Sequence, residues 1–247
     1  MDGSRALQVG SATNGGGTGD LYAGAGSPFS VDKRTGESGT AGSGLAYCLA
    51  KRALDIVGGL TLATVFSPVF VVVTVAMLRD DGPIFFGHKR IGKDGKTFKV
   101  YKFRTMVPNA QQVLENLLES NPEMRAEWEQ DHKLRDDPRI TRVGQFLRKT
   151  SLDELPQLWN VFKGEMSLVG PRPVVEAELP KYGRALRHYC ATKPGITGLW
   201  QVSGRNDTDY RRRVALDRYY SERASILLDV NILLRTVWVV VGRRGAY

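Results

Sequence analysis

Residues 56–78 form an apolar stretch without a single charged side chain, and few folds can accommodate one. A run of this length and composition exceeds the usual threshold for a membrane helix. Basic residues lie at both ends of the stretch, with Lys51 and Arg52 before it and Arg79 after it. Because positive residues mark the cytoplasmic side of a membrane segment, both ends are expected on that side.

Ser67 and Pro68 stand in the middle of the stretch. A proline inside a helix removes one backbone hydrogen bond and crowds the carbonyl four residues earlier, here that of Thr64, so a bend is expected. We predict a re-entrant helix, broken at Ser67 and Pro68, that enters one leaflet and returns. A kinked helix that crosses the membrane is the main alternative, and a buried core segment is the second.

Composition divides the chain into three regions. Residues 1–46 are rich in Gly, Ser and Thr, which is typical of a disordered tail. Residues 47–82 hold the re-entrant helix, and residues 83–247 are expected to form a cytoplasmic domain with interfacial helices. The chain of 247 residues has a net charge of +9 and only two cysteines. These values predict an anionic partner and exclude a disulfide framework.

The remaining pattern predicts an α+β fold that is membrane-associated, monotopic and mostly helical. Two short strands within residues 84–104 flank Asp94-Gly95, a strong hairpin signal. Asn121 and Pro122 are typical of a helix start, and Asp207-Thr208 can cap a helix that begins near residue 210. Further helices are expected over residues 109–118, 122–134, 141–149 and 226–241.

Two adjacent carboxylates, Asp153 and Glu154, are the main candidates for chemistry. Ser151 and Glu154 fit a capping box, which predicts a helix over residues 152–163 that Gly164 ends. A role in stabilising the start of this helix would by itself explain why both acids occur here. Two carboxylates near several arginines, however, suggest a place for a divalent metal and a diphosphate. The arginines are Arg148, Arg172 in Gly-Pro-Arg-Pro, and Arg205 in Ser-Gly-Arg-Asn.

Several long motifs occur together and in a fixed order, and they cover about residues 47–247. The chain closely resembles the bacterial sugar transferases, also called monotopic phosphoglycosyl transferases or polyprenyl-phosphate hexose-1-phosphate transferases. It is similar to the short form of this family, which includes exopolysaccharide-initiating undecaprenyl-phosphate galactose or glucose phosphotransferases. The motifs are Lys102-Phe-Arg-Thr-Met106, Ser151-Leu-Asp-Glu-Leu-Pro-Gln157, Gly164-Glu-Met-Ser-Leu-Val-Gly-Pro-Arg-Pro173, Pro194-Gly-Ile-Thr-Gly-Leu-Trp-Gln-Val-Ser-Gly-Arg-Asn206 and Gly245-Ala-Tyr247.

The resemblance implies a reaction in which hexose-1-phosphate moves from a UDP-hexose to undecaprenyl phosphate and UMP leaves. Asp153 would form a covalent phosphosugar intermediate, and Glu154 would orient the site, bind metal or manage protons. Both carboxylates would hold Mg²⁺. The expected phosphate or substrate contacts are Lys102, Arg104, Arg148, Arg172 and Arg205, with Asp217 as a weaker candidate.

The resemblance also implies a bacterial inner-membrane protein whose catalytic domain faces the cytoplasm and contacts phospholipids. It leaves an oligomer open, and no nucleic-acid partner is expected. Two other classes of function remain. A basic membrane-surface module that binds nucleic acid or anionic lipid would explain the charge, although no nucleic-acid-binding motif supports it. A scaffold that has lost transferase activity would keep the motifs without turnover.

Overall fold

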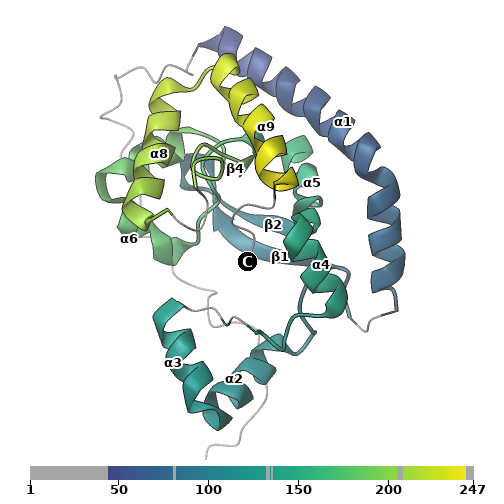
Figure 1. The fold of residues 1–247 in the computed structure, drawn as a ribbon. Coiled ribbons are helices and arrows are strands. Elements are labelled where there is room, and N and C mark those ends of the chain that lie inside the picture. Colours follow the sequence, from purple (N-terminus) through teal and green to yellow (C-terminus); the bar gives the residue numbers. More distant parts are fainter. Residues whose placement is uncertain (1–43, 80–81, 132–133, 135, 205–207, 243–247) are drawn as a thin grey trace, which may run out of the picture. The chain divides into compact units, whose positions relative to one another are not determined.

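The computed structural model describes residues 44–79, 82–131, 134, 136–204 and 208–242. Figure 1 traces these segments as helices joined by short strands, in keeping with the predicted α+β class. The longer elements are α1 (Leu45–Met77), β1 (Phe85–Ile91), β2 (Thr97–Phe103), α2 (Ala110–Ser120), α3 (Pro122–Asp131), α4 (Arg142–Thr150), α5 (Gln157–Lys163), α8 (Tyr210–Arg223) and α9 (Ile226–Val241). The shorter ones are η1 (Lys93–Gly95), η2 (Leu152–Glu154), β3 (Ser167–Val169), η3 (Glu176–Glu178), α6 (Leu179–Tyr182), η4 (Gly183–Ala185), α7 (Leu186–Ala191) and β4 (Gly195–Thr197).

Helix α1 contains the apolar stretch and is long and apolar enough to cross a membrane by length and composition. It runs through Pro68 without interruption, so the prediction that the helix is broken at Ser67 and Pro68 is wrong. The Ser67 hydroxyl donates to the Thr64 carbonyl at 2.8 Å, and that carbonyl is the one that loses its usual donor at Pro68. The helix therefore bends along its length, as Figure 1 shows, and stays continuous.

The first turns of α1 are fixed by charged contacts. Lys51 Nζ lies 2.9 Å from Asp229 Oδ2 on α9. Arg52 donates to the last carbonyls of α5, those of Val161 at 2.7 Å and Phe162 at 2.8 Å. Because arginine binds helix C-terminal carbonyls well, this end of α1 is held to the domain that follows it.

The far end of α1 packs on the same domain. Val73 and Met77 are buried against Phe103 of β2 and Leu147 of α4. Between the two ends, a Cβ on Gly58 would lie 2.7 Å from the Leu168 side chain, so the helix passes very close to β3. Other apolar side chains of α1 are exposed, among them Val57, Leu60, Val65, Val71, Val72 and Val75.

Strands β1 and β2 form the predicted hairpin. They pair antiparallel from Phe85 opposite Phe103 to Ile91 opposite Thr97. Asp94 and Gly95 at the turn have φ values of 58° and 72°. Asp and Gly tolerate these left-handed conformations better than most residues, which explains why the dipeptide marks the turn.

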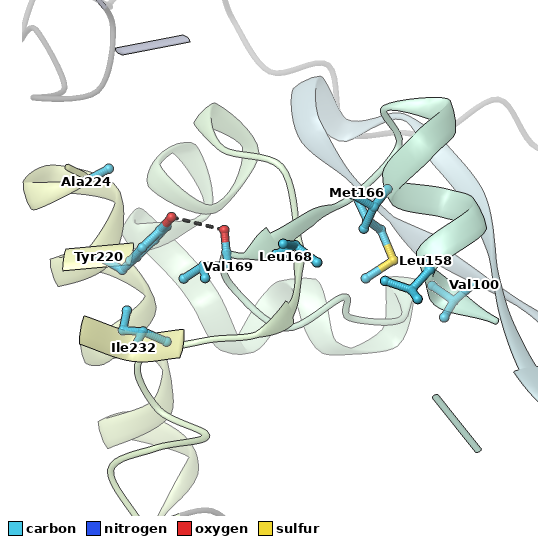
Figure 2. Packing of buried hydrophobic residues seen from close by; sticks show 9 residues of the cluster. Val100, Leu158, Met166, Leu168, Val169, Tyr220, Ala224 and Ile232 are labelled. Atoms are coloured by element: carbon cyan, nitrogen blue, oxygen red, sulfur yellow. Dashed lines mark hydrogen bonds between the residues drawn. The ribbon is translucent and has the colours of Figure 1, made fainter. Parts of the chain in front are cut away.

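The main core lies where β2, α5, β3, α8 and α9 meet. Figure 2 shows Met166, Leu168 and Val169 between the side chains of the other elements. Tyr220 of α8 reaches across this core, and its hydroxyl donates to the Val169 carbonyl at 3.0 Å. Strands β3 and β4 pair in parallel beside it. The core thus fixes the elements on which the candidate site is built.

Two predicted caps are corrected by the structure. Ser151 has a left-handed φ of 58° and makes no side-chain cap; it ends α4, and η2 and α5 replace one continuous helix. Helix α8 is capped by Asp209, which accepts from Arg212 N at 2.6 Å. Of the predicted pair, residue 207 lies outside the described residues. The starts predicted at Asn121 and near residue 141, and the stop at Gly164, are confirmed.

Candidate active site

Strand β2 brings Lys102 to the two carboxylates. The Lys102 ammonium donates to Glu154 Oε1 at 2.6 Å and to Asp153 Oδ2 at 3.4 Å. The Asp153 side chain is 13% exposed, whereas the Glu154 side chain is 34% exposed. The structure therefore joins three predicted site residues in one cluster, with Asp153 in the least accessible position.

The turn between α4 and α5 sets the position of the acids. Ser151 reverses the chain in a left-handed conformation, and Asp153 and Glu154 follow on the single turn of η2. Pro156 comes next and precedes the first turn of α5. A capping box would have placed the same acids along one helix; the tight turn instead directs both toward Lys102 of a strand about fifty positions earlier.

The charges in this cluster depend on each other. Burial raises the pKa of Asp153 above its usual value, and the positive charge of Lys102 opposes that rise. Burial alone would lower the pKa of Lys102, but the Glu154 and Asp153 carboxylates raise it above its usual value. Lys102 therefore stays protonated and favours the ionised form of Asp153, which is the form that a nucleophile needs.

Arg148 extends the basic environment from the last turn of α4. Its Nε donates to Thr105 Oγ1 at 2.9 Å, just beyond β2. Helix α4 can approach this segment because Gly144 lies against the Thr105 backbone, where a Cβ would collide. The charge of Arg148 also acts on Asp153 and lowers its pKa, although burial and Lys102 have larger effects.

Asn160 is a site component that sequence reasoning missed. It is fully buried in α5, and its side chain accepts from Tyr101 N at 3.1 Å and donates to Lys99 O at 2.7 Å. It also donates to Glu165 Oε2 at 2.8 Å. These bonds fix the strand that carries Lys102 against the helix that follows the acids. The bonds to β2 span 59 and 61 residues, so no local signal reveals them.

The Gly-Pro-Arg-Pro turn places Arg172 after β3. Gly170 N donates to Thr197 O at 2.9 Å and Gly195 N donates to Pro171 O at 2.8 Å, so β4 holds the turn on both sides. The Arg172 side chain is exposed, and its guanidinium carbon lies 5.8 Å from the centre of the Trp200 ring. Its charge acts on Lys102, which connects it to the cluster.

Three other predicted residues have different surroundings. Asp217 is buried in α8, where it accepts from the Tyr182 hydroxyl at 2.7 Å, and burial raises its pKa to about 7. Arg104 is buried one residue beyond β2, with its guanidinium against Gly82. Arg205 lies outside the described residues. The phosphate-binding roles of these three stay predictions.

A metal ion bound at the two carboxylates would complete its coordination with water or phosphate oxygens. Among the described residues, no group of three or more His, Cys, Asp or Glu side chains comes close enough to hold a metal ion. Asp153 and Glu154 offer carboxylate oxygens side by side at Lys102. Mg²⁺ typically binds one or two carboxylates together with phosphate oxygens, so this pair fits a site that a diphosphate completes.

An apolar groove of about 680 Å³ adjoins the cluster. It runs between α1, the hairpin and α5, and its walls include Leu155 and Pro156, which directly follow the acids, and Tyr101, which precedes Lys102. The lining residues are Ala63, Phe66, Ser67, Phe70, Val71, Phe85, Tyr101, Leu155, Pro156, Leu158, Trp159 and Phe162. Ser67 of the bent α1 segment is therefore part of this wall.

Comparison with known proteins defines the class. The family model described as bacterial sugar transferase matches residues 46–243, so the chain belongs to this family. It is 54% identical over 197 residues to a UDP-galactose-lipid carrier transferase of Erwinia amylovora, and 53% identical over 197 residues to an undecaprenyl-phosphate galactose phosphotransferase of Salmonella typhimurium. Each match covers 80% of this chain and 41% of the relative.

A further relative is similar in length. The exopolysaccharide production protein ExoY of Rhizobium meliloti is 45% identical over 224 residues, which is 90% of this chain and 97% of that protein. The chain thus spans about two fifths of the two longer relatives but nearly all of this one. This agrees with the predicted resemblance to the short form of the family.

Proposed function

We propose that this protein transfers hexose-1-phosphate from a UDP-hexose to undecaprenyl phosphate and releases UMP. The observation that carries the proposal is the buried Asp153 beside Lys102, at 3.4 Å, in a chain that belongs to the sugar transferase family. An ionised carboxylate supported by a fixed cation suits nucleophilic attack on a phosphorus atom. The names of the relatives support a sugar donor and a lipid-linked acceptor.

Two displacements at phosphorus account for the transfer. An Asp153 oxygen attacks the β-phosphorus of the donor, the bond from that phosphorus to the bridging oxygen breaks, and UMP leaves with the bond's electron pair. The resulting acyl phosphate carries the hexose. A phosphate oxygen of undecaprenyl phosphate then attacks the same phosphorus, and the Asp153 carboxylate is released. Lys102 and Arg148 stabilise negative charge that develops near Asp153.

Asp153 and Glu154 would hold Mg²⁺ together with phosphate oxygens of the donor. When bound, the ion offsets the charge of the diphosphate and makes UMP a better leaving group. Glu154 is the more exposed of the two acids and pairs with Lys102 at 2.6 Å. It therefore keeps the ammonium next to Asp153 when no donor is bound.

The apolar groove suits the lipid acceptor. A polyprenyl chain is a branched hydrocarbon, and burial of apolar surface stabilises binding by roughly 25 cal/mol per Å². The groove is lined almost wholly by apolar side chains of α1 and α5 and borders the residues next to the acids. A chain lying there places its phosphate near Asp153, while the rest remains close to the apolar exposed face of α1.

The contacts of α1 support a re-entrant arrangement in the cytoplasmic membrane. Lys51 and Arg52 at one end and Met77 at the other all contact the domain that carries Asp153. A helix that crossed the bilayer would place its ends on opposite sides, about 30 Å apart, and would break one set of contacts. UDP-sugars are made in the cytoplasm, so we infer that the domain faces that compartment.

We propose galactose or glucose as the hexose, in the first membrane step of exopolysaccharide synthesis. Two relatives are named for galactose or UDP-galactose, and another is an exopolysaccharide production protein. A relative of Escherichia coli, 40% identical over 210 residues, is named for UDP-glucose. The names therefore support both sugars.

The test is UMP release by the full chain in detergent with undecaprenyl phosphate, Mg²⁺ and a panel of UDP-sugars. We expect release with UDP-galactose or UDP-glucose that depends on the acceptor for continued turnover. Asp153→Asn should lose activity by several orders of magnitude, because an amide cannot form the acyl phosphate. Asp94→Asn, at the exposed hairpin turn, is the matched control and should stay active. Absence of UMP release with every UDP-sugar would refute the proposal.

A further inference from the structure

The face of the hairpin that carries Lys102 has two further side chains beside this residue. Residues directly opposite each other in an antiparallel pair place their side chains on the same face. Phe86 lies opposite Lys102, and His88 lies opposite Val100. Because side chains two positions apart share a face, Phe86, His88 and Lys102 lie on one face of the hairpin. Opposite Cβ atoms are about 5 Å apart and diagonal neighbours roughly 7–8 Å, so both β1 residues adjoin the cation of the site.

The other face of the hairpin has different surroundings. Phe85 and Tyr101 belong to that face, and both line the apolar groove. Phe85 also stacks on Phe103, with the ring centres 5.5 Å apart. The alternation of side chains therefore directs one face to the groove proposed for the lipid acceptor, whereas the face with Phe86 is the one from which Lys102 reaches the acids.

Phe86 and His88 form an aromatic pair at the surface. Their ring centres are 6.0 Å apart, and the ring planes are inclined by 48°. Phe86 is 52% exposed, and His88 is also exposed. A single exposed apolar side chain is common and indicates nothing by itself. This pair is distinguished by its position, because it presents aromatic surface beside the charged groups of the site.

The imidazole of His88 has a fixed orientation. Its Nδ1 lies 3.0 Å from the Lys89 carbonyl oxygen, and since a carbonyl only accepts, Nδ1 carries the hydrogen. Burial lowers the pKa of His88, and the charges of Arg90 and Lys102 lower it further, while the bond to Lys89 opposes them in part. The ring is therefore neutral at neutral pH, and its Nε2 is a hydrogen-bond acceptor.

An uncharged acceptor next to an aromatic ring suits one part of the donor. A phosphate has no hydrogen to donate when ionised, so it suits the cations Lys102 and Arg148 and not this acceptor. A hexose has hydroxyl donors and apolar C–H surfaces, and one oxygen joins it to the phosphorus that Asp153 attacks. The nucleoside lies one phosphate further away. The sugar is thus the part of the donor that comes next to Lys102 and its neighbours on the hairpin.

We propose that Phe86 and His88 bind the hexose of the donor. The Phe86 ring contacts the C–H surface of the sugar, and His88 Nε2 accepts a hydrogen bond from one of its hydroxyl groups. This inference rests on the proposed function and deepens it, because it names residues that select the sugar. A site that bonds a hydroxyl group discriminates against a sugar that lacks it.

The experiment measures binding of UDP, UDP-galactose and UDP-glucose to the full chain in detergent by isothermal titration calorimetry. Asp153→Asn is the parent of every variant, because it prevents consumption of the donor. Phe86→Ala and His88→Phe should each weaken binding of the preferred UDP-hexose about tenfold, whereas UDP affinity should change less than twofold. Phe86→Tyr keeps the ring and His88→Gln keeps an acceptor, so both should retain most of the UDP-hexose affinity.

A matched variant and a set of analogues complete the design. Phe146→Ala is the control for Phe86→Ala, because Phe146 of α4 is similarly exposed, at 56%, and it should bind UDP-hexose like the parent. UDP-hexoses that each lack one hydroxyl group supply a second readout. The analogue without the hydroxyl that bonds to His88 should bind the parent and His88→Phe equally, while the other analogues show the loss. A purely structural role of His88 would not produce this difference.

Three results would overturn the inference. They are UDP-hexose affinity within twofold of the parent in either Phe86→Ala or His88→Phe, equal losses for UDP and UDP-hexose, and the same loss for every deoxy analogue. If Phe86→Ala fails to fold, judged by its melting temperature, His88→Phe and the analogues still decide the question. Failure of the proposed function has a different outcome: the parent then binds no UDP-hexose, and the inference falls with it.

Discussion

Replacing Lys102 with Met should move the pH dependence of the reaction. The Lys102 ammonium lies 3.4 Å from Asp153 Oδ2 and 2.6 Å from Glu154 Oε1, so the change removes the nearest cation from a buried carboxylate. Burial already raises the pKa of Asp153 and Lys102 opposes this rise. Without Lys102, the pKa of Asp153 rises further. As the pH is lowered, Asp153 then takes up a proton, and loses its nucleophilic form, at a higher pH than in the wild type.

The size of the shift follows from the distances and the exposure. An opposite charge at this range lowers a carboxyl pKa by about 1–3 units, and the 36% exposure of the Lys102 side chain favours the lower half of that range. We therefore expect the acidic limb of kcat/KM to move upward by about 1–2 units. At pH values below the pKa of Asp153, each further pH unit leaves roughly tenfold less of its ionised form.

The assay is UMP release at low donor concentration from pH 5.5 to 9. Lys99→Met is the matched control, because it removes the same charge from an exposed position on the same strand. Its limb should coincide with that of the wild type. If Lys102→Met lowers kcat/KM by one factor at every pH, Lys102 contacts the donor but does not adjust Asp153, and the electrostatic reasoning given above is refuted.

Three further changes test other parts of the account. Asn160→Leu should destabilise the protein by about 3 kcal/mol or more, measured by thermal unfolding in detergent, because it leaves backbone groups of β2 unpaired in the core; an unchanged melting temperature would contradict this role. Asp217→Asn should stabilise it by roughly 4 kcal/mol at pH 8 and hardly at pH 4, because the folded carboxyl has a pKa of about 7 and wild-type stability falls as the pH rises from about 4 to 7, a loss that the amide avoids; a gain that is independent of pH would refute it. In a chain lacking Cys48 and Cys190, single cysteines at residues 44 and 96 should both resist an impermeant thiol reagent until intact cells are permeabilised; labelling at residue 44 alone would show a crossing helix.

The parts of the fold that depend on neighbours in the sequence could be predicted. The hairpin followed from Asp94-Gly95 because these residues tolerate the φ values that the turn needs. The start of α3 followed from Asn121, whose side chain accepts from two backbone N–H groups of the first turn. In each case the controlling contact spans three residues or fewer, so the local pattern contains the information.

The capping prediction failed because one motif has two local outcomes. Ser151 can accept a hydrogen bond at a helix start or adopt a left-handed conformation at a helix end. The structure shows the second outcome, with Ser151 at the end of α4. The choice of the two acids as candidates came from the motif and not from the helix assigned to it, and the structure places both beside Lys102.

The supporting residues of the site could not be predicted because their contacts are distant in sequence. Asn160 bonds to Lys99 of β2, and Lys51 pairs with Asp229, which is more than half the chain away in sequence. Trp200 was visible only as one letter in a family motif, and its pairing with Arg213 depends on how α8 packs. Such contacts arise from tertiary structure, which composition and periodicity do not encode.

The covalent step through Asp153 is the central claim, and intact-mass analysis tests it most directly. The full chain is mixed with Mg²⁺ and UDP-galactose or UDP-glucose without lipid acceptor, and the protein mass is then measured. The account predicts an added mass of one hexose phosphate on the wild type, its loss when undecaprenyl phosphate is added, and its absence from Asp153→Asn. An enzyme that turns over with acceptor but never gains this mass, or a modified Asp153→Asn variant, would contradict it.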